Sequence, residues 1–344
     1  LRCLVGSEMC IRDRNSTPPI PAAGAGDVFI RGGELVIEEA ARVQAITLTY
    51  GNGGDITVDL SGDLVIRGLD SGLFAGSGLV IDPEFEGTTR VVDIVPGPDG
   101  AFPFLEIERV FDGSPADIAT NCTPGACRVS YGGFGAFDGN PATTRALGNA
   151  GDVRVGAENV RIEDGGEISN TSFFGGDGGT ITIEARGDVL LSGDPDAFSG
   201  SFDAIRGGLF ANAQGGGSAG RIEITGATLE IDAFGAILSE LRGGAGQGGD
   251  VDVNVDRLRV RGNGRIDTST RGTGNAGEIA IVASESVEIE GARDALEFSG
   301  ITSVAQPEAI GNAGSISIDA PDIVIRDGGQ VLSLIHISEP TRHR

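Results

Sequence analysis

The sequence lacks lysine and tryptophan altogether, and it has only two histidines, one methionine and two tyrosines. Both histidines, His336 and His343, fall within residues 336–344 at the end of the chain. The usual histidine and lysine proton shuttles, and the Ser-His-Asp and Cys-His arrangements, are therefore excluded from the first 335 residues. Zinc sites that use histidine ligands are excluded there too.

Basic residues are also scarce. The chain has 25 arginines against 50 Asp and Glu residues, which gives a formal net charge of −25 at pH 7. Such a surface repels phosphate groups, so we expect no nucleic acid partner and no anionic membrane surface. No apolar run reaches the roughly 18 residues that a membrane helix needs, which predicts no membrane insertion. Cationic partners, divalent counter-ions and solubility at high salt stay open.

The two ends of the chain differ from the rest. Residues 1–14 and 334–344 resemble translated sequencing-adapter sequence, an artefact of read assembly, and we set both aside in predicting the fold. The remaining region, 15–333, carries 20 arginines and 47 acidic residues. A repeat runs through nearly all of it without a linker-like boundary, which predicts a single domain that continues past the repeat seen here.

Glycine corners of the form G-x-x-G recur along this region, each followed by two β-branched residues spaced two apart. The corners begin at Gly51, Gly148, Gly176, Gly217, Gly246, Gly274 and Gly311. The paired residues behind them are Ile56/Val58, Val153/Val155, Ile181/Ile183, Ile222/Ile224, Val251/Val253, Ile279/Ile281 and Ile316/Ile318. A less glycine-rich copy over residues 23–30 ends in Val28 and Ile30. The alternation predicts strands with one buried face.

Each unit continues with a second apolar pair and then a third inward residue. The second pairs include Leu64/Ile66, Val160/Ile162 and Leu229/Ile231, and the third positions include Ile168, Ile237 and Ile266. Three short strands per turn predict an all-β fold without helices, a parallel β-helix (solenoid) of about eight coils with a repeat of about 28 residues. Stacked at about 4.8 Å per coil, such coils form a rod about 40 Å long.

The second residue of each corner is polar and able to form hydrogen bonds. These residues are Asn52, Asn149, Asp177, Ser218, Gln247, Asn275 and Asn312. Stacked coil on coil, their side chains should form a structural ladder like those of cross-β assemblies. The corner glycines are expected to supply the positive φ angles that tight turns require.

The longest interruption of the repeat, residues 70–147, is rich in proline and suggests an extended arm that leaves one corner. Within it, Cys122-Thr-Pro-Gly-Ala-Cys127 places Pro and Gly at the centre of a type II turn, a geometry that could bring both sulfur atoms within disulfide range. A disulfide would fit an oxidising compartment. Two free thiols are the alternative, and a metal site is weaker because no histidine can complete it.

Other functions have weaker support in the sequence. Asp and Glu occur everywhere, so no pair of them identifies catalytic carboxylates, whose spatial separation decides the chemistry. Gly- and Asp-rich segments such as 175–179 recur about every 28 residues and not every nine, which disfavours a calcium roll, although calcium binding between acidic coils stays open. Arg186-Gly187-Asp188 spells the integrin tripeptide, which short sequences often match by chance. We predict no cofactor, no catalytic residue and no dedicated metal site.

Several repeat segments resemble those of filamentous-haemagglutinin-like exoproteins: 71–77 (SGLFAGS), 164–170 (DGGEISN), 208–213 (GLFANA), 274–281 (GNAGEIAI) and 327–333 (DGGQVLS). The resemblance covers about residues 24–333. It implies a right-handed β-helix in a large protein of Gram-negative bacteria, exported by two-partner secretion through an outer-membrane transporter. It also implies a secreted or cell-surface location and adhesion to a host or neighbouring cell surface or glycan. That family's N-terminal secretion domain has no counterpart in this sequence.

The leading hypothesis is a structural and adhesive rod segment of a secreted or cell-surface exoprotein, without catalytic activity. The alternative is a carbohydrate-active β-helix enzyme, a lyase or hydrolase, which should concentrate Asp and Arg on one face across neighbouring coils. A passenger segment that delivers a toxin encoded downstream would look the same within this sequence.

Overall fold

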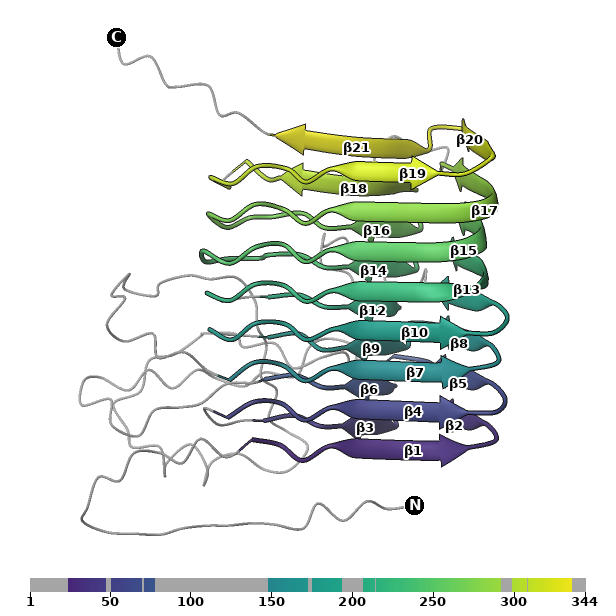
Figure 1. Cartoon of the computed structure of the whole chain (residues 1–344), viewed down its shortest axis with the longest axis vertical. Coiled ribbons are helices and arrows are strands. Elements are labelled where there is room, and N and C mark those ends of the chain that lie inside the picture. The colour runs from purple at the N-terminus through teal and green to yellow at the C-terminus, as the bar shows by residue number, and fades with distance from the viewer. Residues whose placement is uncertain are drawn as a thin grey trace, which may run out of the picture.

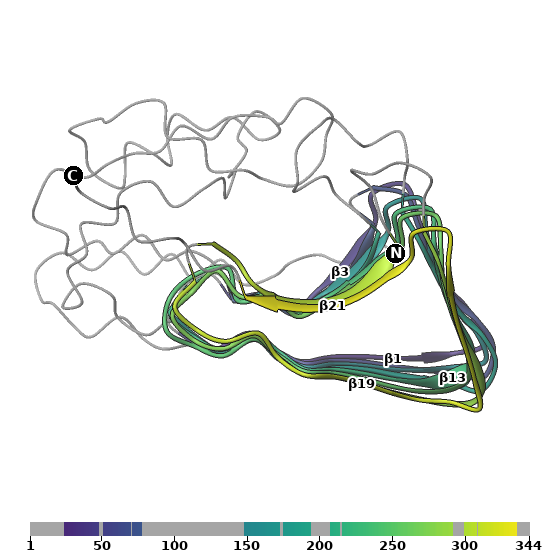
Figure 2. The same cartoon turned by 90° about the horizontal axis from the view of Figure 1, so that it is seen from above.

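The computed structural model describes residues 24–47, 51–69, 71–77, 148–172, 175–193, 207–213, 215–291, 299–307 and 309–335. These residues form an all-β solenoid, and none of them is helical. The coils stack along one axis (Figure 1). Seen from above, with later coils nearer the viewer, the chain runs anticlockwise, so the solenoid is right-handed (Figure 2). The predicted parallel β-helix is confirmed.

Each coil contributes strands at a first, a second and a third position. The first strands are β1 (Val28–Gly32), β4 (Ile56–Leu60), β7 (Val153–Ala157), β10 (Ile181–Ala185) and β19 (Ile316–Asp319). The second strands are β2 (Leu35–Ile37), β5 (Leu64–Arg67), β8 (Val160–Glu163), β11 (Val189–Ser192) and β20 (Asp322–Arg326). In three coils one long strand serves both positions: β13 (Ile222–Asp232), β15 (Val251–Val260) and β17 (Ile279–Glu290).

The third strands form a separate sheet that closes the solenoid, called here the third face. They are β3 (Arg42–Gln44), β6 (Gly72–Phe74), β9 (Glu167–Ser169), β12 (Gly208–Phe210), β14 (Ala236–Leu238), β16 (Arg265–Asp267), β18 (Gly300–Ala305) and β21 (Gln330–Ile335). All pairing between coils is parallel, and each strand pairs with its equivalent one coil away. The third face lies opposite the first strands when the rod is viewed along its axis (Figure 2).

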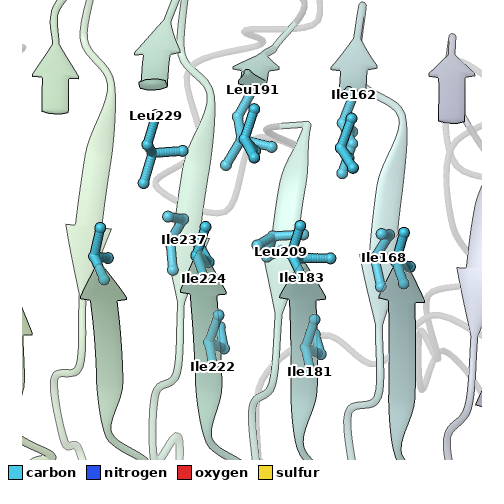
Figure 3. Packing of buried hydrophobic residues seen from close by; sticks show 14 of the residues in the cluster. Ile162, Ile168, Ile181, Ile183, Leu191, Leu209, Ile222, Ile224, Leu229 and Ile237 are labelled. Carbon is cyan, nitrogen blue, oxygen red and sulfur yellow. The ribbon is translucent and has the colours of Figure 1, made fainter. Parts of the chain in front are cut away.

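Equivalent apolar residues of successive coils lie in register. Ile181 of β10 pairs with Val153 of β7 on one side and with Ile222 of β13 on the other. From the second to the seventh coil, the twelve paired β-branched residues that follow the glycine corners are at most 2% exposed. Inward residues from all three strand positions meet in this interior (Figure 3), among them Ile181, Ile222, Leu191, Leu229, Leu209 and Ile237. The sequence periodicity therefore identified the core correctly.

The glycine corners differ from the prediction in their backbone conformation. None of the fourteen corner glycines has a positive φ. Most positive φ angles occur instead between the second and third strands, for example at Asp164 (53°) with Gly165 (85°) and at Gly262 (55°) with Asn263 (66°). Gly, Asn and Asp tolerate this left-handed region better than other residues do, which suits them to a sharp turn.

The corner glycines are required by close packing between coils. A Cβ atom on Gly217 would lie less than 3.0 Å from the carbonyl oxygen of Gly176, its equivalent one coil earlier. The same clash would occur at both glycines of every corner from the third coil onward. The expectation that these glycines supply positive φ is therefore wrong. Glycine is required at these positions because the neighbouring backbone occupies the space that a side chain would need.

Two predicted boundaries shift. Residues 71–77 fall within the predicted interruption 70–147, but the repeat also predicts Leu73 as the inward residue of the third strand in this unit. The structure bears out the second prediction: β6 pairs with β3 and β9, and Leu73 is fully buried, so 71–77 belong to the second coil. At the other end, β21 reaches Ile335 and pairs Leu334 with Val304, two residues into the segment 334–344 that was set aside. Residues 78–147 and 336–344 lie outside the described residues, as does the N-terminal stretch 1–23.

Candidate functional site

The predicted corner residues lie in one continuous column along the rod. The side-chain oxygen of Asn52 accepts a hydrogen bond from the backbone N–H of Asn149 (3.0 Å), and Asn149 accepts one from Asp177 (3.0 Å). The pattern continues through Ser218, Gln247, Asn275 and Asn312, with donor–acceptor distances of 2.8–3.2 Å. The polar atom of each coil thus orders the backbone of the next coil, which is a structural task.

A second column of the same kind was missed in the sequence. Asp27 accepts from the N–H of Asp55 (3.0 Å), Asp55 from that of Asp152 (2.9 Å), and Asp152 from that of Thr180 (2.7 Å). Asp250 does the same for Glu278 (2.9 Å). The signal was present in the sequence, because an Asp directly follows the last corner residue in each of these coils. These carboxylates therefore hold coils together, and their abundance says little about catalysis.

Charged side chains at the ends of the second strands alternate in sign over the first three coils and again over the fifth to eighth coils, with the neutral Ser192 of the fourth coil between them. Arg67 lies 2.8 Å from Glu163 in the next coil and 3.9 Å from Glu38 in the preceding one. The hydrogen bond and the charge of Glu163 raise the pKa of Arg67. Farther along, Arg261 pairs with Asp232 (2.9 Å), and Arg326 pairs with Glu288 (2.6 Å) and Glu290 (3.0 Å). These arginines bind carboxylates of their own rod.

A buried polar cluster lies on the outer side of the third face. Asp267, at the end of β16, is 6% exposed; its Oδ1 accepts from the N–H of Ser269 (2.6 Å) and its Oδ2 from the Thr302 hydroxyl (2.6 Å). Burial is the main cause that raises the pKa of Asp267, and the charge of Glu240 raises it further. The hydrogen bonds from Ser269 and Thr302 and the charge of Arg265 act in the opposite direction.

Glu240 of this cluster is itself engaged. Its carboxylate lies 3.0 Å from the guanidinium of Arg242, and its backbone N–H donates to Asn212 Oδ1 (2.8 Å). The cluster therefore spans four coils through Asn212, Glu240, Asp267 and Thr302. In this cluster a buried carboxyl group with a raised pKa lies beside a second carboxylate, an arrangement that acid–base chemistry uses.

The tripeptide Arg186-Gly187-Asp188 is built into the coil. The guanidinium of Arg186 pairs with Glu158 (2.7 Å) and donates to the backbone oxygens of Leu60 (3.2 Å) and Ser61 (3.1 Å). The N–H groups of Gly187 and Asp188 bond to residues of the coil before. Arg186 thus fastens neighbouring coils, and its charge is compensated within the rod.

Several predicted features cannot be placed. Cys122 and Cys127 lie outside the described residues, and so do both histidines. Within the described parts of the chain, no group of three or more His, Cys, Asp or Glu side chains is arranged to hold a metal ion. The same parts contain no helix of the length and apolarity that crossing a membrane requires.

Comparison with known proteins adds no relative: no protein-family model, no curated protein and no solved structure matches the chain.

Proposed function

We propose that this chain is a structural and adhesive rod segment of a large secreted or cell-surface exoprotein and that it has no catalytic activity. The observation that carries the proposal is the use of polar and charged side chains. The corner ladder, the aspartate column and the arginine pairs all link one coil to the next. Polar side chains that bond one coil to the next stiffen the rod, and they are not available as reactive groups. This arrangement suits a stiff spacer better than a catalytic surface.

The proposal extends to partners through the resemblance of the repeats to filamentous-haemagglutinin-like exoproteins. An outer-membrane transporter of the two-partner secretion type would export the chain. The exported rod would contact a host or neighbouring cell surface, or a glycan on it. The large acidic excess, a net charge of −25, favours partners that carry positive charge or that bind through divalent cations.

A bead-attachment assay tests adhesion. Beads coated with the full chain are expected to attach to bacterial or epithelial cells, or to a surface of immobilised glycans, more often than beads coated with an unrelated acidic protein. Beads coated with the Ile181→Asp variant, whose coils should not form, are the matched control and should not attach. Equal attachment of folded and unfolded chains would count against a folded adhesive rod.

A second candidate, a carbohydrate-active β-helix enzyme, is favoured by one observation, the Asp267–Glu240 cluster. An enzyme needs one carboxyl group that is protonated near neutral pH and one that is ionised. Against it, both oxygens of Asp267 already accept hydrogen bonds from the protein. Incubation of the full chain with neutral and acidic polysaccharides separates the two candidates. New reducing ends or unsaturated sugars that disappear with Asp267→Asn would support the enzyme and overturn the rod as the sole function.

A further inference from the structure

One inward polar side chain is not satisfied by the fold. Asn170 directly follows β9 and is 0% exposed. Neither its Oδ1 nor its Nδ2 atom has a hydrogen-bond partner among the described residues. Buried amide atoms without protein partners are rare in folded proteins, and where they occur a small bound molecule often supplies the missing hydrogen bonds.

The neighbouring coils show how this position is normally closed. In register with Asn170 stand Ala75 in the coil before and Ala211 in the coil after. The backbone oxygen of each alanine accepts a bond from a corner glycine: Gly151 donates to Ala75 (2.9 Å) and Gly220 to Ala211 (2.7 Å). These bonds join the third strand to the glycine corner across the interior.

The corresponding bond is missing at Asn170. The equivalent donor is Gly179, which is buried, and its N–H makes no hydrogen bond within the described part of the chain. A Cβ atom on Gly179 would lie 3.1 Å from Asn170 Nδ2, so the amide group and the glycine are neighbours. Three buried polar groups, two on Asn170 and one on Gly179, therefore meet at one place without protein partners.

The seventh coil shows one chemistry that fits this position. In the seventh coil, Ser303 stands in the column of Asn170; its hydroxyl donates to the oxygen of Gly277 (3.1 Å) and accepts from the N–H of Gly314 (2.9 Å). A hydroxyl thus both donates and accepts between the third strand and the corner. A neutral molecule of the same size and hydrogen-bonding capacity, flanked here by two small alanines, would satisfy the groups at Asn170.

We propose that Asn170 and Gly179 bind one internal water molecule. The water accepts hydrogen bonds from the N–H of Gly179 and from Asn170 Nδ2, and it donates one to Asn170 Oδ1. Water is neutral and able both to donate and to accept, and buried waters typically bind about three otherwise unpaired polar groups. In the third coil this water has the role that the Ser303 hydroxyl has in the seventh coil. It connects the third strand to the glycine corner by hydrogen bonds.

Two measurements on the full chain test the proposal. A high-resolution crystal structure should show a density peak between Asn170 and the Gly179 nitrogen. Oxygen-17 relaxation dispersion, which counts long-lived internal waters in solution, should show one fewer in Asn170→Ala than in the wild type, because alanine permits the direct Gly179 bond made at Ala75 and Ala211. Asn170→Ser should lose the same water, since its hydroxyl can act as that of Ser303 does.

Thr182→Ala, an outward change on β10, serves as the matched control and should leave the count unchanged. Equal counts in the wild type and Asn170→Ser would overturn the proposal. So would a wild-type density map in which the Asn170 amide bonds directly to Gly179 with no peak between them. If Asn170→Ala does not fold, the serine variant and the wild-type map still decide the matter.

Discussion

At the scale of single residues, the spacing between coils sets what each position accepts. Backbone of one coil lies directly over backbone of the next at the glycine corners, so the smallest side chain would overlap a carbonyl oxygen. One residue away the constraint disappears: a Cβ on Gly216 would have no atom within 4 Å, whereas one on Gly217 would overlap Gly176. Neighbouring glycines in one sequence run thus have unrelated roles.

Gly217→Ala is therefore expected to destabilise the chain by about 1–3 kcal/mol, the usual cost of overpacking a rigid site. Gly216→Ala is the matched control and should leave stability unchanged or slightly raised. The measurement is the free energy of unfolding from denaturant titration. A similar effect of both alanines would contradict the close-packing explanation, because they differ only in the space available to Cβ.

Asp267 should make stability depend on pH in a specific direction. Burial raises its pKa in the folded state above the ordinary value of 3.8. The unfolded chain then releases the proton first, so the contribution of Asp267 to the free energy of unfolding falls as pH rises from 3.8 to the folded-state pKa and is constant above it. Charges that face Asp267 are those of Glu240, which strengthens the effect, and Arg265, which weakens it.

Asp267→Asn removes this ionisation and keeps the geometry, because an amide can accept from Ser269 and donate to Thr302. The variant is expected to gain stability relative to the wild type as pH rises from about 4 to 7. Asp256→Asn, an exposed change on β15 beside Ser284, is the matched control. A stability difference between Asp267→Asn and the wild type that does not change with pH would show that Asp267 is not protonated preferentially in the folded state.

At the scale of elements, alternation with a period of two carried most of the prediction. It marked Ile181 and Ile183 as inward and Thr182 as outward, and the structure agrees. It could not show that β13, β15 and β17 each run through two strand positions. There Gly226 pairs with Val255 and Thr228 with Arg257, so pairing continues through the bend. A bent strand and two separate strands have the same alternation of inward and outward residues, so the sequence pattern could not tell one long strand from two short ones.

The candidate site was less predictable than the core. The corner ladder follows from position alone, because the same place in each repeat carries a polar residue. The Asp267 cluster depends on which residue types meet. Asn212 and Glu240 share one position of the repeat, and Asp267 and Thr302 share another, but the residue types at both positions change from coil to coil. Likewise, the clearance above each corner glycine depends on the distance between coils, and that distance is a property of the folded molecule.

Ile181→Asp tests the inward assignment. It places a charge without a partner among fully buried residues, and a loss of more than about 4 kcal/mol is expected. Thr182→Asp, on the opposite side of the same strand beside Arg154, is the matched control and should change stability little. Thermal melting followed by circular dichroism gives the comparison. An unchanged melting curve for Ile181→Asp would contradict the assignment of β10.

At the scale of the whole molecule, the interior of the rod is a stack of coil layers with no single central core. Each coil packs only on its neighbours, so its stability is approximately the sum of the coil's own terms and two interfaces. In the eighth coil the inward residues Ile323 and Ile325 are 47% and 48% exposed, while Ile231 in the fifth coil is fully buried. The last coil has one described interface, through β17 and β18, and therefore gains less from stacking.

Substitution should follow this gradient: Ile231→Ala should lower the free energy of unfolding by roughly 2–5 kcal/mol, and Ile325→Ala by far less, since less apolar surface is lost from a half-exposed side chain. Denaturant titration of both variants gives the comparison.

Protection against amide hydrogen exchange should follow the same gradient. The N–H groups of β10, β13 and β15 are expected to exchange most slowly, and those of β19 and β20 much faster, because the last coil can open without the rest. Exchange measured by mass spectrometry on the full chain provides the test. Equal protection from β10 to β20 would instead show that all coils open together and that the solenoid behaves as one cooperative unit.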